Sequence, residues 1–200
     1  MLVQSTAALV LATAVAAAQA QLDPSGLRIT VDNETLLPGE STTIRLEAYF
    51  DSARDYCVGG IGTWLDSSTG GAGLSDVRLI GPLLGPGTTA GSPGEHGVRG
   101  ILAGQINGLG DIYGDPSNPI AFWEATYTAP VDVAAPFDVM LETRTSLFYV
   151  YPYMYSPSTE SRLDGFQDDT AMIRVIPAPA GAALLLGIAM ACRCRRIEHA

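Results

Sequence analysis

Apolar and polar residues alternate along most of the central part of the chain, which is the pattern of half-buried β-strands. Residues 42–50 show this alternation most clearly. One face of the segment would carry Ile44, Leu46, Ala48 and Phe50, and the other Thr43, Arg45, Glu47 and Tyr49. Further strands are predicted at Leu27–Val31, Tyr56–Leu65, Val77–Ile80, Gly97–Ala103, Ile120–Tyr127, Phe137–Arg144, Ser146–Tyr151 and Thr170–Ile176.

Gly, Pro and Asp separate these strands, and Ser67–Ser75 and Gly81–His96 are expected to be long surface loops. The spacing predicts an all-β fold, a single antiparallel β-sandwich of about seven to nine strands. The first predicted strand, the turn Leu37–Glu40 and the longer alternating strand after it resemble the opening of Ig-like and cohesin-like modules. That resemblance implies a fold class and no activity.

Residues 1–20 have the features of a signal peptide. Ala7–Ala18 is a run of mostly small apolar residues that is too short to span a bilayer. Ala18 and Ala20 flank Gln19 in the small-x-small pattern that signal peptidase cleaves. Cleavage there would leave Gln21 as the new N-terminus. The alternative is a buried Ala-rich helix.

The C-terminal tail, residues 177–200, combines prolines, an apolar stretch and a basic end. The stretch Ala178–Ala191 would form a helix roughly 21 Å long, which is short for a bilayer span. Arg193, Arg195 and Arg196 follow it. Because positive charges stay on the cytoplasmic side of a membrane, the rest of the chain would face outward.

This tail resembles the PEP-CTERM sorting signal of bacterial exported proteins. The matching pieces are Pro177-Ala178-Pro179, Ala180–Ala191 and Arg193–Arg196, with Ala178 where the family has Glu. The resemblance implies recognition by an exosortase, a membrane-embedded transpeptidase or protease, and delivery to the cell surface or extracellular matrix. A plain C-terminal membrane anchor is the alternative. The expected organisation is therefore signal peptide 1–20, exported domain 21–176 and sorting tail 177–200.

Charge excludes one class of partner for the exported domain. The chain has 11 basic residues, all arginine, and a net charge of −10. The segment from Gln21 to Ile176 holds 8 Arg against 20 Asp and Glu, or −12. Such a surface repels phosphate backbones, so no nucleic-acid partner is expected. Cys57 is the only cysteine of this segment, so no disulfide within the domain is predicted.

No catalytic constellation is recognisable in the exported domain. His96, its only histidine, lies in a Gly/Pro-rich segment and is expected to be a solvated loop residue rather than a member of a triad. Glu47, Glu124 and Glu142 lie in predicted strands. Paired carboxylates suffice for glycoside hydrolysis, so a secreted hydrolase stays as the alternative to a non-enzymatic protein.

Three aspartates cluster in a predicted turn, at Asp164, Asp168 and Asp169. Hard oxygen ligands on turns suit Ca²⁺, which is abundant outside cells. The cluster lacks the EF-hand pattern, which favours solvated carboxylates, with a Ca²⁺ site as the alternative. No other cofactor is expected.

Four tyrosines alternate with other residues at Tyr149, Tyr151, Tyr153 and Tyr155. In an extended segment their side chains would share one face. The pattern favours an aromatic ladder over the core. The alternative is a ligand surface for polysaccharide, since tyrosine offers both an apolar ring and a hydroxyl. Trp64 and Trp123 lie in predicted strands and are expected in the core.

Together these features predict an exported protein of the cell envelope, cell surface or extracellular matrix. It would be a non-enzymatic structural or adhesive module, held by its C-terminal helix before processing and associated with extracellular polysaccharide. Its processing partners would be signal peptidase and an exosortase.

Overall fold

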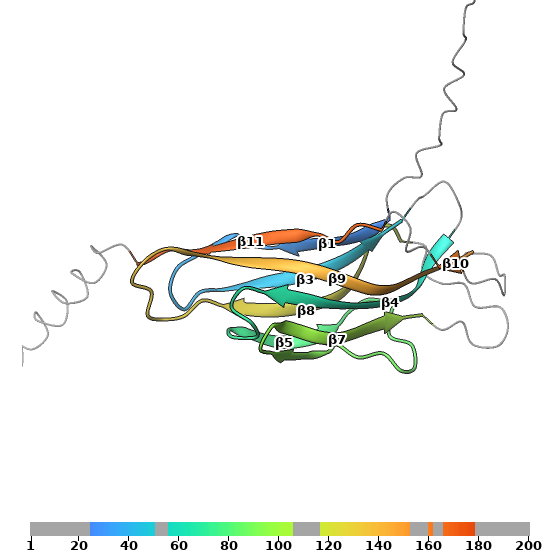
Figure 1. The fold of residues 1–200 in the computed structure, drawn as a ribbon, viewed down its shortest axis with the longest axis horizontal. Helices are drawn as coiled ribbons and strands as arrows, with labels where there is room; N and C mark the ends of the chain where they lie inside the picture. Colours follow the sequence, from blue (N-terminus) through green and yellow to red (C-terminus); the bar gives the residue numbers. More distant parts are fainter. Residues whose placement is uncertain (1–24, 51–55, 106–116, 153–159, 162–165, 179–200) are drawn as a thin grey trace, which may run out of the picture.

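The computed structural model describes residues 25–50, 56–105, 117–152, 160–161 and 166–178. These residues form strands and connecting segments (Figure 1). The strands are β1 Gly26–Val31, β2 Thr35–Leu36, β3 Ser41–Tyr49, β4 Tyr56–Ser67, β5 Leu74–Leu79, β6 Ser92–Gly94, β7 Gly97–Gly104, β8 Ile120–Thr128, β9 Phe137–Pro152, β10 Glu160–Ser161 and β11 Thr170–Val175. The predicted signal peptide 1–20, with Ala18 and Ala20, lies outside the described residues, as does Gln21.

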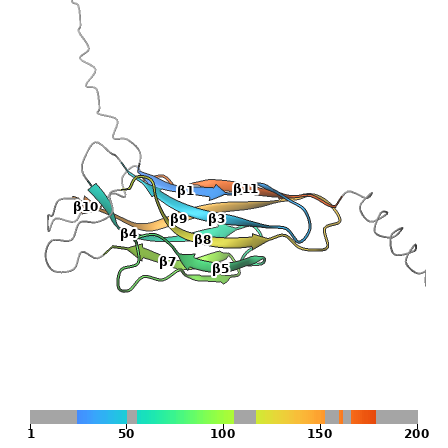
Figure 2. The ribbon, with the colours of Figure 1, turned by 180° about the vertical axis from the view of Figure 1, so that it is seen from behind.

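Two sheets pack face to face. The first has the order β1-β3-β8-β5, and the second has the order β2-β11-β9-β4-β7-β6, with β10 paired to β9. Figure 1 shows the second sheet in front, and Figure 2 shows the first sheet from the opposite side. The predicted all-β sandwich is confirmed. It is not purely antiparallel, because β2 pairs with β11 in parallel.

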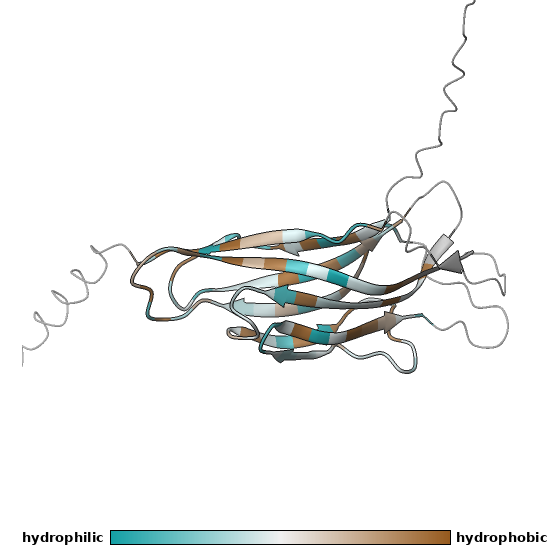
Figure 3. Ribbon diagram, in the orientation of Figure 1, coloured by the Kyte–Doolittle hydropathy of each residue, from teal (hydrophilic) through white to brown (hydrophobic). Residues whose placement is uncertain are grey.

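The core lies between the two sheets and follows the alternation of the sequence. In β3, Ile44, Leu46 and Ala48 are fully buried, while the residues between them are partly exposed. Figure 3 shows apolar and polar residues alternating along the strands. Among the largest fully buried side chains are Trp123, Tyr127, Phe122 and Phe148. Burial of apolar area on both inner faces is the main term that stabilises such a sandwich.

The predicted break at Thr145 is wrong, because Phe137–Arg144 and Ser146–Tyr151 form one strand, β9. Thr145 stays in the ladder, opposite Thr63 of β4. Its backbone N–H and hydroxyl donate to the carboxylate of Asp168 at 3.3 and 2.8 Å. The polar run from Glu142 to Ser146 therefore pairs within the strand instead of ending it.

Three short strands, β2, β6 and β10, were not predicted, since two or three residues carry no readable alternation. β6 lies inside the loop expected at Gly81–His96. The loop expected at Ser67–Ser75 ends earlier, where β5 begins at Leu74.

One edge of the sandwich is closed by hydrogen bonds between the two sheets. The backbone N–H of Leu27 in β1 donates to the carbonyl of Gln167 at 2.9 Å, and Gln167 N–H donates to Ser25 at 2.9 Å. A Cβ at Gly26 would lie 2.4 Å from the Gln167 carbonyl oxygen, so the close approach requires glycine.

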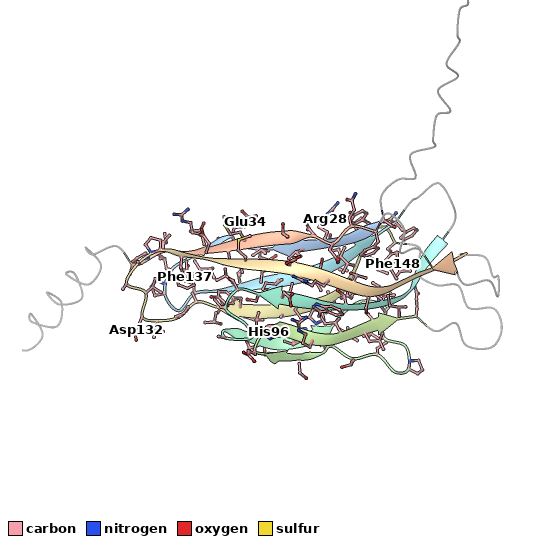
Figure 4. All side chains as sticks on the ribbon, in the orientation of Figure 1. Arg28, Glu34, His96, Asp132, Phe137 and Phe148 are labelled. Carbon is pink, nitrogen blue, oxygen red and sulfur yellow. The ribbon has the colours of Figure 1, made fainter. Side chains whose placement is uncertain are left out.

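The described chain begins and ends at opposite ends of the long axis of the sandwich. Arg28, near the start of β1, lies at one end with Phe148, and β11 ends near Phe137 and Asp132 at the other (Figure 4). Ala178 is the last described residue. Within the described ranges, no helix has the length and apolar character needed to cross a membrane.

Candidate functional site

The outer face of the second sheet carries the partly exposed side chain of Trp64. Ile61 and Leu65 of β4 are fully buried in the core. Register shifts interrupt β4 between these two residues, and Trp64 lies under the exposed Arg99 and lines a surface hollow, so its side chain is on the outer face. The expectation of a core position is confirmed for Trp123, whose Nε1 donates to the Ala90 carbonyl at 2.9 Å. For Trp64 that expectation is wrong.

Asp66 belongs to a cluster of four charged side chains next to Trp64. Asp66 lies between Arg99 of β7, at 2.5 Å, and Arg144 of β9, at 2.8 Å. Arg144 also contacts Glu142 at 3.3 Å. The Arg99 guanidinium lies over the Trp64 ring, 5.5 Å from its centroid. Three neighbouring strands thus hold two arginines and two carboxylates in one cluster whose formal charges cancel.

Two hollows adjoin this cluster on the same face. The charged hollow, about 350 Å³, is lined by Asp66, Ser67, Ser68, His96, Arg99, Met140, Glu142 and Arg144. The apolar hollow, about 590 Å³, is lined by Gly62, Thr63, Trp64, Thr89, Arg99, Gly100, Ile101, Leu102 and Ser146. Arg99 lines both, so the hollows are neighbours, and we call them together the Trp64 trough. At Gly100 an added Cβ would meet nothing within 4 Å, so the trough is open there.

The indole N–H of Trp64 is buried and donates no hydrogen bond to any described residue. A buried polar group without a partner costs about 1–3 kcal/mol, and native structures contain few of them. Hydrogen bonding to the described residues therefore does not account for the position of this indole.

The structure places the predicted ligand tyrosines only in part. Tyr149 and Tyr151 lie two residues apart in β9, with their backbones opposite Gly60 and Cys57 of β4. Their side chains are outside the described part, and so are Tyr153 and Tyr155 altogether. The tyrosine surface stays a prediction.

Two of the three predicted Ca²⁺ ligands are described, and both accept hydrogen bonds. Asp168 binds Thr145, and the Asp169 carboxylate accepts the backbone N–H of Ile29 at 2.8 Å. Asp164 lies outside the described residues. No cluster of three or more His, Cys, Asp or Glu side chains suited to a metal occurs among the residues that the structure describes. The Ca²⁺ site stays a prediction.

His96 is exposed in the turn between β6 and β7, as expected of a loop histidine (Figure 4). Its carbonyl accepts the Ser67 N–H at 3.1 Å. Its side chain lines the charged hollow.

The strand glutamates are divided between the two sheets. Glu47 and Glu124 lie on the outer face of the first sheet, and Glu142 lies on the second. Each contacts an arginine. Among the described residues, shared arginines bring two pairs of carboxylates together: Arg144 joins Asp66 and Glu142, and Arg45 joins Asp32 and Glu124. Asp66 was not singled out from the sequence, because its partners come from strands distant along the chain.

No protein-family model matches the chain, and no curated protein matches it. Among solved structures, the chain is similar to the cohesin module of a family 33 glycoside hydrolase from Clostridium perfringens, at 11% identity and a TM-score of 0.45, over 78% of this chain and 98% of that one. The similarity to a cohesin–dockerin complex from Clostridium thermocellum has 11% identity and a TM-score of 0.47, over 76% of this chain and 99% of that one. The similarity to the seventh ScaB type I cohesin of Pseudobacteroides cellulosolvens has 11% identity and a TM-score of 0.45, over 78% of this chain and 94% of that one. At this level of likeness we draw no inference about ligand or partner.

Proposed function

We propose that the chain is an exported, non-catalytic structural or adhesive module. The C-terminal tail holds it at the cell envelope, and its sandwich contacts extracellular polysaccharide. The observation that carries this proposal is the placement of the two ends of the sandwich. β11 leads into the tail at the end near Phe137 and Asp132, whereas β1 begins at the far end (Figure 4).

This placement suits a protein tethered at its C-terminus. If the tail lies in the membrane with Arg193, Arg195 and Arg196 on the cytoplasmic side, the far end of the sandwich projects into the surroundings. At that end β4 begins and β9 finishes. The predicted tyrosine surface, which starts at Tyr149, would then be presented away from the membrane.

The paired charges support a binding role rather than a catalytic one. Glu124 contacts both Arg45 and Arg78, and Asp66 contacts both Arg99 and Arg144. Ion pairing with two arginines accounts for the place of each of these carboxylates on its sheet without a catalytic task.

The predicted signal peptide and the predicted sorting tail would each be recognised by a processing enzyme. Signal peptidase would cleave after Ala20. An exosortase would recognise Pro177-Ala178-Pro179 and the apolar stretch behind it. The product would be a domain of residues from Gln21 onward, first anchored in the membrane and then transferred to the surface or matrix.

Replacement of Arg193, Arg195 and Arg196 by Gln tests the anchor. The expected result is weaker membrane retention or inverted topology, measured by cell fractionation and mass spectrometry of both termini. The matched control replaces Arg28, Arg78 and Arg174, three exposed arginines of the sandwich, by Gln. It removes the same formal charge and should leave retention unchanged. Equal fractionation of the two variants, or an intact chain found free in the cytosol, would contradict the proposal.

A further inference from the structure

We infer that the Trp64 trough is a binding site for a chain of neutral sugars. The inference rests on the proposed function, in which the exported sandwich contacts polysaccharide. It deepens that function by naming the binding site and the class of glycan. It places the site on the outer face of β9, β4 and β7, on residues other than the tyrosines predicted from the sequence.

The apolar hollow supplies a platform for a sugar ring. A pyranose ring has an apolar C–H face, which packs on aromatic side chains, and Trp offers the largest such surface. Trp64 is held on a central strand, with β9 on one side and β7 on the other. Leu102, 38% exposed, lies beside it in the same hollow. Rigid positioning on paired strands keeps Trp64 in place without a ligand. The Arg99 guanidinium lies over the ring, 5.5 Å from its centroid, so a sugar would pack against the indole and this guanidinium together.

The charged hollow supplies donors and acceptors next to the platform. Sugar hydroxyls both donate and accept, so they match a site that offers guanidinium N–H groups and carboxylate oxygens together. Arg99 and Arg144 are held by Asp66 at 2.5 and 2.8 Å, and their positions are therefore set before binding. One ring stacked over the apolar hollow would place the hydroxyls of the next ring near these groups.

Charge selects the class of glycan. The cluster of two arginines and two carboxylates is formally neutral, and the segment around it carries −12. An anionic polysaccharide would be repelled by the surface at large and would gain no net positive charge at the trough. A neutral polysaccharide meets neither obstacle.

Shape favours a chain over a small enclosed ligand. Hollows of about 590 and 350 Å³ fall in the range of small-molecule sites, about 300–1,000 Å³, but these two lie side by side on an exposed sheet face. A surface of this kind holds several consecutive sugar units and lets the polymer continue at both ends.

The test is affinity electrophoresis of the full-length chain, purified in mild detergent. Native gels contain soluble mixed-linkage β-glucan or dextran as neutral probes, or polygalacturonate as the anionic probe. We expect retardation by at least one neutral probe that persists in high salt, because no net charge drives it. Trp64→Ala should weaken the apparent affinity about tenfold, the scale of one lost aromatic contact. Arg99→Gln should weaken it as well.

Arg78→Gln is the matched control for Arg99→Gln. Arg78 also contacts a carboxylate, Glu124, but lies on the first sheet, so its loss should leave retardation unchanged. If Trp64→Ala does not fold, Ser146→Gln replaces it. Ser146 is an exposed residue lining the apolar hollow, and a longer side chain there fills the site while leaving the platform intact.

The two tryptophans give a second readout. Trp123 is fully buried, so acrylamide should quench mainly Trp64, and a bound glycan should protect it. In Trp64→Phe that protection should vanish. Retardation that is equal in wild type, Trp64→Ala and Ser146→Gln would overturn the inference, and so would a preference for polygalacturonate or retardation by no probe. Fractionation of the tail variants does not depend on these outcomes, so a failure here is distinguishable from a failure of the anchor.

Discussion

The carboxylate of Asp169 accepts a hydrogen bond from the backbone N–H of Ile29 at 2.8 Å. Ile29 belongs to β1 of the first sheet, while the Asp169 backbone N–H donates to the Thr143 hydroxyl of β9 in the second, also at 2.8 Å. One aspartate thus joins the two sheets. Its carboxylate also pairs a backbone N–H on the outer edge of β1, where an edge strand would otherwise present unpaired backbone groups.

Asp169→Ala should therefore lower the free energy of unfolding by about 1–3 kcal/mol, because the partly buried Ile29 N–H loses its acceptor. Asp169→Asn keeps an amide oxygen and should retain most of the stability. Urea unfolding followed by circular dichroism measures both. Asp132→Ala, at an exposed loop position, is the control. Equal stability of the Ala variant and wild type would show that the contact does not hold the sheets together.

The buried hydroxyl of Tyr127 should make the stability of the domain depend on pH in the alkaline range. Burial raises the pKa of its hydroxyl, and the hydrogen bond with Thr69 lowers it by less. An unfolded tyrosine ionises near pH 10, so above about pH 10 the unfolded state releases its proton first and stability falls as pH rises. Below that pH the contribution is fully present.

Melting temperatures of wild type and Tyr127→Phe between pH 8 and 11 test this linkage. The wild type should lose stability more steeply above pH 10 than the Phe variant, which has no proton to release at this position. Parallel curves would contradict the assignment.

Trp123→Phe should destabilise the fold by about 1–3 kcal/mol. The smaller ring leaves unfilled space in the core, and the Ala90 carbonyl loses the indole N–H as its donor. Trp64→Phe, on the outer face, should cost less, since its indole N–H has no described partner to lose. Chemical unfolding of the two variants gives the comparison, and an equal cost would argue against the different burial of the two side chains.

Asp66→Asn should free the Trp64 ring from its arginine. The substitution removes the charge that holds Arg99, whose guanidinium lies over the indole, so acrylamide should quench Trp64 more efficiently. Asp132→Asn, at an exposed loop position, serves as the control. Unchanged quenching in Asp66→Asn would mean that the ion pair does not position Arg99.

Much of the fold was predictable because alternation is a local property. The buried and exposed faces of β3 follow directly from residues 42–50, and β1, β7, β8 and β11 begin within one residue of their predicted starts. The outward position of Trp64 was harder to predict, because register shifts interrupt β4 at Gly62/Thr63 and Thr63/Leu65 and because large aromatic residues are commonly expected in cores.

The trough was not predictable, because its members are joined by strand order. Trp64, Arg99 and Arg144 meet only because β4 lies between β7 and β9. Nothing local to any one of these strands indicates its neighbours. The closure at Asp169 depends in the same way on a segment that follows β9 by many residues but pairs with the first strand.

The end of β11, from which the predicted tail continues, has a mechanical consequence. If the tail is fixed and a polymer pulls on β4, β7 or β9, the load passes along the sandwich from β9 into β11. These strands are antiparallel neighbours, with Thr170–Val175 registered against Phe137–Glu142, so a pull along their length strains all of their ladder hydrogen bonds at once instead of opening them in sequence. A sandwich attached in this way resists shear between the cell and the material around it.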